Sequence, residues 1–315
     1  MSKNRIYTII KWVFAIAAYG YLIYKLVSFD KYDELFATWK QIPTDKYIWL
    51  AAVFVLLPLN LFLEASKWIR LTKNTISISV SSAIKSVLAG ICSGFFTPNR
   101  IGEVLGRISY LPSSCYAQGL TLSIVNSITQ NLTILICGIP ASIVFFMFVY
   151  NSGISSAMGV YIAVLGVCLL IFCLLYFRLP RLFKTKRFAK IKRFTDCLSD
   201  YSTNDLLKIM LISLVRYSVF CIQFFCVLSF FGIEITAWQA LIAIPANYLF
   251  ITFTPSFAFS EVAVRSSYAV LFVGMFSPNT VSIIFAGVLI WFINTVIPML
   301  TGSIFFIKSK QKSVV

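Results

Sequence analysis

Long apolar stretches dominate this 315-residue chain and decide what it can fold into. Residues of the set AVILMFWYC make up 59% of the sequence and charged residues only 12%, whereas soluble domains are about half apolar and about a quarter charged. A helix of about 20 apolar residues can cross about 30 Å of hydrocarbon. Runs of this kind lie at 5–28, 47–66, 119–150, 154–177, 206–231 and 281–307. The sequence therefore predicts an all-α integral membrane protein, with a single membrane domain over 1–315.

The charged, cysteine and histidine content excludes several functions. The formal net charge is +16, which in a membrane protein indicates basic cytoplasmic loops and contact with anionic lipid rather than nucleic acid. The eight cysteines are scattered and the chain has no histidine. This removes the usual zinc spacings and any nucleophile that depends on a histidine base. We therefore expect no metal, no cofactor and no nucleic-acid partner.

Lysine and arginine residues indicate which ends of the apolar helices face the cytoplasm. The segment 178–193 contains eight of them and no acid, so 178–205 is predicted to be a basic cytoplasmic linker. Its apolar residues are spaced as in an amphipathic helix, which favours contact with the anionic inner leaflet. Both termini are basic and are placed in the cytoplasm, whereas 29–46 contains four of the eleven acids and is placed outside.

These side assignments leave two apolar segments, 80–108 and 237–276, that must each begin and end on the same side. Each contains a Thr-Pro step, at Pro98 and Pro255, where the proline removes an N–H donor and disfavours a helical residue before it. Charged residues that follow these steps could not face lipid cheaply. We therefore expect two re-entrant helical hairpins that break at the prolines; two full spans for each segment is the alternative.

The hairpins fall at matching places in the two halves of the chain, which indicates a repeat. Repeat unit one covers about 47–150 and repeat unit two about 206–307, with the first hairpin entering from the cytoplasm and the second from outside. Spans 5–28 and 154–177 lie outside the repeat. The expected architecture is thus about six transmembrane helices plus two oppositely oriented hairpins. Interrupted helices in two inverted halves are the best sequence indication of a transport site.

Each predicted hairpin contains a Glu and an Arg four residues apart, in "EVLGR" and "EVAVR". This spacing puts both side chains on one helix face, where a simple intrahelical ion pair is the alternative interpretation. Guanidinium groups bind phosphate through a planar fork of N–H donors. We expect Arg100, Arg107 and Arg265 to bind a headgroup phosphate, and Glu103 and Glu261 to orient these arginines or to exchange protons with them.

Other polar residues within the apolar spans are candidates for the same cavity. Glu64 is a third intramembrane carboxylate and is assigned the same orienting or proton-exchanging role. Asn126, Gln130 and Asn131 occur at roughly helical spacing, and Arg216 lies within the span 206–231. Lining of the cavity is one interpretation for these four residues, and hydrogen bonds or ion pairs between helices are the other. The expected partners of Glu64 are Lys67, Arg70 or Arg100.

Read together, "TPNRIGEVLGR" and "TPSFAFSEVAVR" resemble the transmembrane region of lysylphosphatidylglycerol synthases, also called the flippase-like domain family. The first stretch matches a P-x-R-x-G-E motif, and Pro255 with Glu261 matches the Pro and Glu of a second motif. "ASKWIRL" at 65–71 resembles a basic-Trp motif of the family. Two stretches depart from it, because "SFAFS" replaces glycines before Glu261 and "VNSITQN" replaces a Glu-Arg and Asp pattern.

The resemblance implies a flippase of the bacterial cytoplasmic (inner) membrane without the aminoacyl-transferring domain, and no enzyme activity. Its implied partners are the bilayer, an anionic phospholipid or a lipid-linked substrate of the polyprenyl-phosphate type, and an envelope glycosyltransferase or lipid-modifying enzyme. Two other functions remain open. One is a membrane enzyme that transfers a group to a lipid phosphate, and the other is a membrane partner of a biosynthetic enzyme that transports nothing itself.

Overall fold

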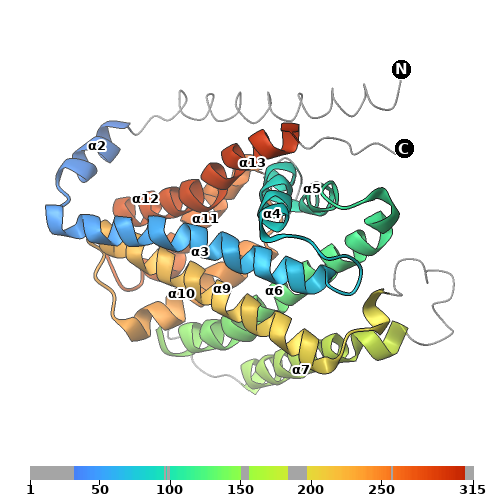
Figure 1. Ribbon diagram of the computed structural model, residues 1–315. Coiled ribbons are helices and arrows are strands. Elements are labelled where there is room, and N and C mark those ends of the chain that lie inside the picture. Colours follow the sequence, from blue (N-terminus) through green and yellow to red (C-terminus); the bar gives the residue numbers. More distant parts are fainter. Residues whose placement is uncertain are drawn as a thin grey trace.

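A computed structural model describes residues 32–95, 97, 100–149, 156–183, 197–256 and 258–308, and this part of the chain is helical without a β-strand (Figure 1). Five helical segments within it are long and apolar enough to cross a membrane. They are Thr44–Thr72, Ser113–Val149, Ile162–Arg181, Thr203–Phe230 and Thr280–Phe305. The prediction of an all-α integral membrane protein is confirmed. The predicted span 5–28 lies outside the described residues.

The helices follow the chain in this order. They are α2 (Tyr32–Lys40), α3 (Tyr47–Thr72), α4 (Val80–Phe95), α5 (Glu103–Ile108), α6 (Tyr116–Val144), α7 (Ser156–Phe183), α9 (Thr203–Phe230), α10 (Ala237–Phe253), α11 (Ala258–Val273), α12 (Thr280–Trp291) and α13 (Ile297–Lys308). Two π-helical turns, η4 (Phe145–Val149) and η6 (Phe292–Val296), extend α6 and join α12 to α13. Short 3-10 helices, η1 (Thr44–Lys46) and η3 (Ser113–Cys115), precede α3 and α6.

Loops that the charges place on one side of the membrane lie at one end of the molecule. At one end, Lys46 before α3 lies 3.7 Å from Glu234 after α9. At the other end, Lys73 after α3 forms an ion pair of 2.6 Å with Asp205 in the first turn of α9. α3 and α9 therefore run antiparallel and side by side, as the predicted crossings require (Figure 1). Which end faces the cytoplasm stays a prediction from the charges.

The two segments predicted as hairpins fold into pairs of helices too short to span. α4 has 16 residues and packs against α5, and α10 has 17 residues and packs against the 16-residue α11. At about 1.5 Å per residue these helices reach about 24–26 Å, less than the hydrocarbon thickness of about 30 Å. α10 ends where Thr254 turns to extended backbone, the conformation that the following Pro255 favours. These lengths favour hairpins over full spans. Pro98 lies outside the described residues.

Each short helix packs against the last span of the other repeat unit. α4 lies on α13, and α10 lies on α6. A glycine makes each contact close: a Cβ atom at Gly302 would lie 2.1 Å from the carbonyl oxygen of Leu88, and one at Gly138 would lie 2.6 Å from the Cβ of Leu249. Small residues let membrane helices approach in this way. Each short helix thus contacts the other predicted repeat unit, while the inverted repeat itself stays a prediction.

Replacing Gly302 with alanine is expected to destabilise the protein by about 2 kcal/mol, because the added methyl group meets backbone atoms of α4 that cannot move aside cheaply. Gly166→Ala in α7 is the matched control, since nothing lies within 4 Å of the position of its Cβ atom. Alanine there is expected to leave stability unchanged or to raise it slightly. Thermal unfolding of both variants in detergent measures the difference. Equal unfolding temperatures would contradict the described contact of α4 with α13.

Candidate functional site

A cavity of about 460 Å³ opens at mid-height between the long helices. Residues 57–64 of α3, 126–134 of α6 and 216–220 of α9 line it, and each of these stretches lies near the middle of its helix. The break between α4 and α5, the break between α10 and α11, and the turn η6 complete the wall. Both hairpins therefore reach one central cavity, which is where transporters built from inverted repeats bind their substrates.

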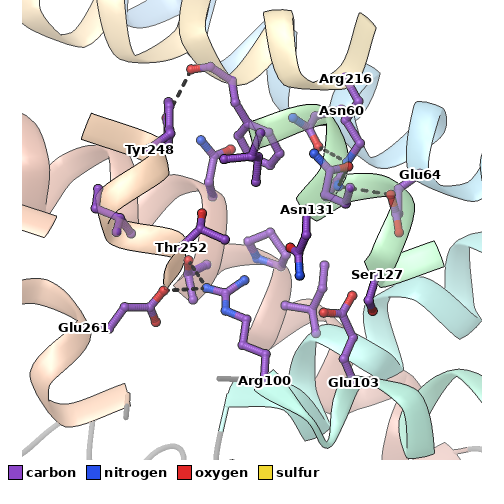
Figure 2. Close-up of a pocket in the computed structure, with 18 of the residues that line it drawn as sticks. Asn60, Glu64, Arg100, Glu103, Ser127, Asn131, Arg216, Tyr248, Thr252 and Glu261 are labelled. Atoms are coloured by element: carbon purple, nitrogen blue, oxygen red, sulfur yellow. Dashed lines mark hydrogen bonds and ion pairs between the residues drawn. The ribbon is translucent and has the colours of Figure 1, made fainter. Parts of the chain in front are cut away.

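The cavity wall is rich in charge. The charged side chains that line it are Arg100, Arg107, Arg216, Arg265, Glu64, Glu103 and Glu261. Four cations face three carboxylates, so the lining has a net positive charge. Figure 2 shows Glu64, Arg216 and Asn60 on one side of the cavity and Arg100 and Glu261 on the other, with Asn131 between them. The charged residues form two networks.

Glu64 is the centre of the first network. Its carboxylate lies 2.5 Å from Arg107, 2.9 Å from Lys67 and 3.0 Å from Arg216, and it accepts a hydrogen bond of 2.9 Å from Asn126. The side chain is 1% exposed. A buried carboxylate is tolerated only with such partners. Three cations around one carboxylate leave this part of the protein positively charged.

The surroundings of Glu64 distinguish among its expected partners. Lys67, three residues along α3, shares its helix face and pairs with it. Arg70 lies six residues along, on another face, and Arg100 pairs instead with Glu261 in the second network. The cross-helix partner of Glu64 is Arg107 of the first hairpin.

Arg107 is fixed in place by two carboxylates. Besides Glu64, it pairs at 2.5 Å with Glu103, which lies four residues before it in "EVLGR" and on the same helix face. Its guanidinium carbon also lies 5.7 Å from the ring centroid of Trp68, a cation–π contact. The side chain is 3% exposed. Arg107 nevertheless lines the cavity, and its Nη1 is buried without a hydrogen-bond partner among the described residues, so its expected contact with a phosphate stays a prediction.

Glu261 is the centre of the second network. Its carboxylate accepts hydrogen bonds from Arg265 at 2.7 Å and 3.2 Å, from Arg100 at 2.9 Å and from the Trp291 indole at 3.3 Å. The pair with Arg265 joins the Glu and Arg of "EVAVR", which share one helix face. The hydrogen bond from Arg100 to Glu261 joins the two hairpins, since Arg100 belongs to the first hairpin and Glu261 to the second. Arg100 donates a further hydrogen bond of 2.9 Å to Thr295 of η6.

A tight backbone turn aims Arg100 at the cavity. The turn is held by two hydrogen bonds of Gly102, whose N–H donates to the Thr97 hydroxyl at 2.7 Å and whose carbonyl accepts from Ser93 at 2.8 Å. A Cβ atom at Gly102 would lie 2.4 Å from the Ser93 carbonyl oxygen, so this position requires glycine. Arg100 itself has φ of 59°, which is unfavourable for a side chain of its size. Such strain is typical of residues held in place for function.

The other four polar candidates all line the cavity, in two different ways. Gln130 accepts hydrogen bonds from Lys67 at 3.3 Å and from Arg216 at 3.0 Å, and Asn126 bonds to Glu64. These residues therefore connect helices as well as lining the wall. Asn131 is exposed and points into the central space (Figure 2).

Several site residues were missed in the sequence. Asn60 accepts a hydrogen bond of 3.0 Å from Arg216. Asn294 and Thr295 lie in the π-helical turn η6 and line the cavity, with Trp291 one residue before it. Turns of this kind occur often at functional sites. The available signal was the presence of polar residues inside apolar spans, at "PLNLF" and "FINTV".

The described residues contain no group of three or more His, Cys, Asp or Glu side chains that could hold a metal ion. The three carboxylates of the cavity are instead taken by arginine and lysine. What the arrangement can do chemically is to offer guanidinium N–H groups to an anion.

Comparison with known proteins agrees with this description. No curated protein matches the chain. The family of the lysylphosphatidylglycerol synthase TM region matches residues 9–302, which includes both hairpins and both charge networks. The chain therefore belongs to the lysylphosphatidylglycerol synthase TM region family, whose members are membrane proteins of lipid metabolism or transport.

Proposed function

We propose that this protein is a lipid flippase that moves an anionic lipid or lipid-linked headgroup across the membrane. The observation that carries the proposal is a set of accessible arginines in the central cavity. The side chain of Arg100 is 35% exposed, that of Arg265 18% and that of Arg216 14%. All three reach the cavity from different helices or hairpins, so a headgroup in the centre could contact them together.

The charge of the cavity favours a phosphate as its occupant. Burying cations away from water is costly unless they are paired, and the arginines exceed the carboxylates in the lining. A phosphate supplies the missing negative charge. Its oxygens also match the planar N–H fork of a guanidinium group. A zwitterionic headgroup carries a cationic group beside its phosphate, so it would add no net negative charge to a cavity that is already positive.

The hairpins supply a mechanism by alternating access. They reach the cavity from opposite ends of the molecule and meet at the ion pair between Arg100 and Glu261. Opening of one hairpin exposes the cavity at one end while the other hairpin keeps it closed at the opposite end. The acyl chains stay in the bilayer while the headgroup crosses through the polar cavity. We place the protein in the bacterial cytoplasmic membrane, with both termini in the cytoplasm and next to an enzyme that makes or uses the lipid.

Purified protein in liposomes is expected to translocate acyl-labelled phosphatidylglycerol at least about tenfold faster than acyl-labelled phosphatidylcholine, because only the first adds net negative charge to the cavity. Reduction of a fluorescent acyl label by dithionite, which reaches one leaflet only, measures the rate. Protein-free liposomes are the control. Equal rates for the two lipids, or no translocation of any anionic lipid, would contradict the proposal. Group transfer to a lipid phosphate in detergent would favour the enzyme alternative.

A further inference from the structure

The ion pair between Arg100 and Glu261 links the two hairpins, and both partners face the cavity. They are 161 residues apart in sequence. Arg100 uses one nitrogen, Nη2, for both Glu261 and Thr295, which leaves Nε and Nη1 without a hydrogen-bond partner among the described residues. Arg265 uses Nε and Nη2 for Glu261, which leaves Nη1. Two guanidinium groups thus share one carboxylate and keep donors for a second anion.

The first hairpin contains the equivalent Glu–Arg pair, and the comparison shows what differs. Arg107 has two carboxylates, because Glu64 of α3 adds to Glu103. Glu64 lies 17 residues after the start of the span predicted at 47–66, and the same count from the start of the span predicted at 206–231 reaches Gln223. Gln223 is buried and neutral, and bonds to Val53 and Asn294.

The second hairpin therefore has a different balance of charge. Arg265 has no second carboxylate in its ion pairs, and Glu261 must serve Arg265 and Arg100 together. The group of Arg100, Arg265 and Glu261 has a net charge of +1. One phosphate diester would make it neutral. Arg107 thus contacts two carboxylates, whereas Arg100 and Arg265 share one.

We propose that Arg100 and Arg265 form the subsite for the headgroup phosphate, and that Glu261 occupies it in the empty protein. An entering phosphate displaces Glu261 from Arg100, while Glu261 keeps its bonds to Arg265 and Trp291. Displacement breaks the direct ion pair between the hairpins, and the phosphate held by Arg100 and Arg265 takes its place, so binding of the anion changes how the two hairpins are joined. This inference rests on the proposed function for its ligand, a phosphate ester of a lipid.

The inference predicts that Glu261→Gln increases the affinity for a phosphate ligand about tenfold, because it removes the competing carboxylate. Glu103→Gln is the matched control. It removes the same charge from the same cavity, and Glu103 is likewise paired with an arginine four residues along, but it does not contact Arg100 through an ion pair. We expect less than a threefold increase for this variant. Calorimetric titration of the full-length protein in phosphatidylcholine nanodiscs measures both affinities.

Two probes distinguish the sources of the phosphate. They are inorganic phosphate and the soluble lipid dihexanoylphosphatidate. Selective gain of affinity in Glu261→Gln for either probe supports the subsite, and the probe that shows it identifies the source. Equal changes in the two variants, or a loss of affinity in Glu261→Gln, overturn the inference. If the wild-type protein transports lipid but both variants change their phosphate affinity equally, only the subsite is overturned. If Glu261→Gln alone gains phosphate affinity but the wild-type protein transports no lipid, only the proposed function is overturned.

A measurement on a protein with the native ion pair covers the case in which Glu261→Gln does not fold. Spin labels at Leu105 of α5 and Leu241 of α10, in a background with the native cysteines replaced, report the distance between the hairpins. Both side chains are more than 60% exposed and lie outside the cavity lining. Dihexanoylphosphatidate is expected to broaden or shift the distance distribution, and Arg100→Gln to remove the response to it. An unchanged distribution at saturating ligand overturns the inference.

Discussion

Replacing Glu64 with glutamine is expected to lower the free energy of unfolding by about 3–5 kcal/mol, which is typical when one partner of a buried ion pair is removed. The carboxylate is 1% exposed and compensates Lys67, Arg107 and Arg216. Glutamine keeps the shape and one acceptor, but it leaves three cations in a buried site with only Glu103 as a carboxylate. For a protein of this size we expect the unfolding temperature to fall by about 5–8 °C.

Glu234→Gln is the control for this prediction. Glu234 also has a lysine neighbour, Lys46 at 3.7 Å, but its side chain is 86% exposed. Exposed pairs of this kind contribute about 0–1 kcal/mol, so the unfolding temperature should hardly change. Thermal unfolding of both variants in the same detergent, followed by tryptophan fluorescence, gives the comparison. Similar behaviour of the two variants would show that the network around Glu64 does not hold the helices together.

Replacing Arg100 with glutamine is expected to reduce translocation of anionic headgroups at least about 100-fold, because the substitution removes both a phosphate ligand and the link to Glu261. The fold should survive. The side chain is 35% exposed, and Glu261 keeps Arg265 and Trp291 as partners. The liposome assay measures the rate, and thermal unfolding of the same preparation shows whether the protein is intact.

Two further variants make the test of Arg100 specific. Arg181→Gln removes the same charge from an exposed position at the end of α7 and should transport at the wild-type rate. Arg100→Lys keeps the charge but lacks the planar fork, so it should recover only part of the activity. Wild-type transport by Arg100→Gln would exclude this residue from the mechanism. Equal losses in Arg100→Gln and Arg181→Gln would point to net charge rather than to the site.

The helical membrane architecture could be predicted because its causes are local in sequence. Apolar length alone identifies the long spans, and the Pro255 step explains where α10 ends. The pairs Glu103–Arg107 and Glu261–Arg265 follow from helical spacing. Loop charges correctly grouped the loops, as the contacts of Lys46 with Glu234 and of Lys73 with Asp205 show.

The other contacts of the site depend on how separate spans pack against each other, and such packing leaves no recognisable pattern in the local sequence. Arg216 meets Asn60 across 156 residues of sequence, and Arg100 meets Thr295 across 195. The same packing decides that Arg107 is enclosed by two carboxylates while Arg265 is not. Sequence reasoning assigned one role to both arginines, since their immediate neighbours are alike.

The contacts of short helices between the two predicted repeat units limit how this protein can move. α4 is held against α13 through Gly302, and α10 against α6 through Gly138. The short helix of each predicted unit therefore packs against the last long span of the other unit. One hydrophobic core combines Val53, Ala141 and Phe145 of the first half with residues of α9 to α12, so the two halves share it. A hairpin that opens must therefore carry its packing partner with it or slide along it at the glycine contact.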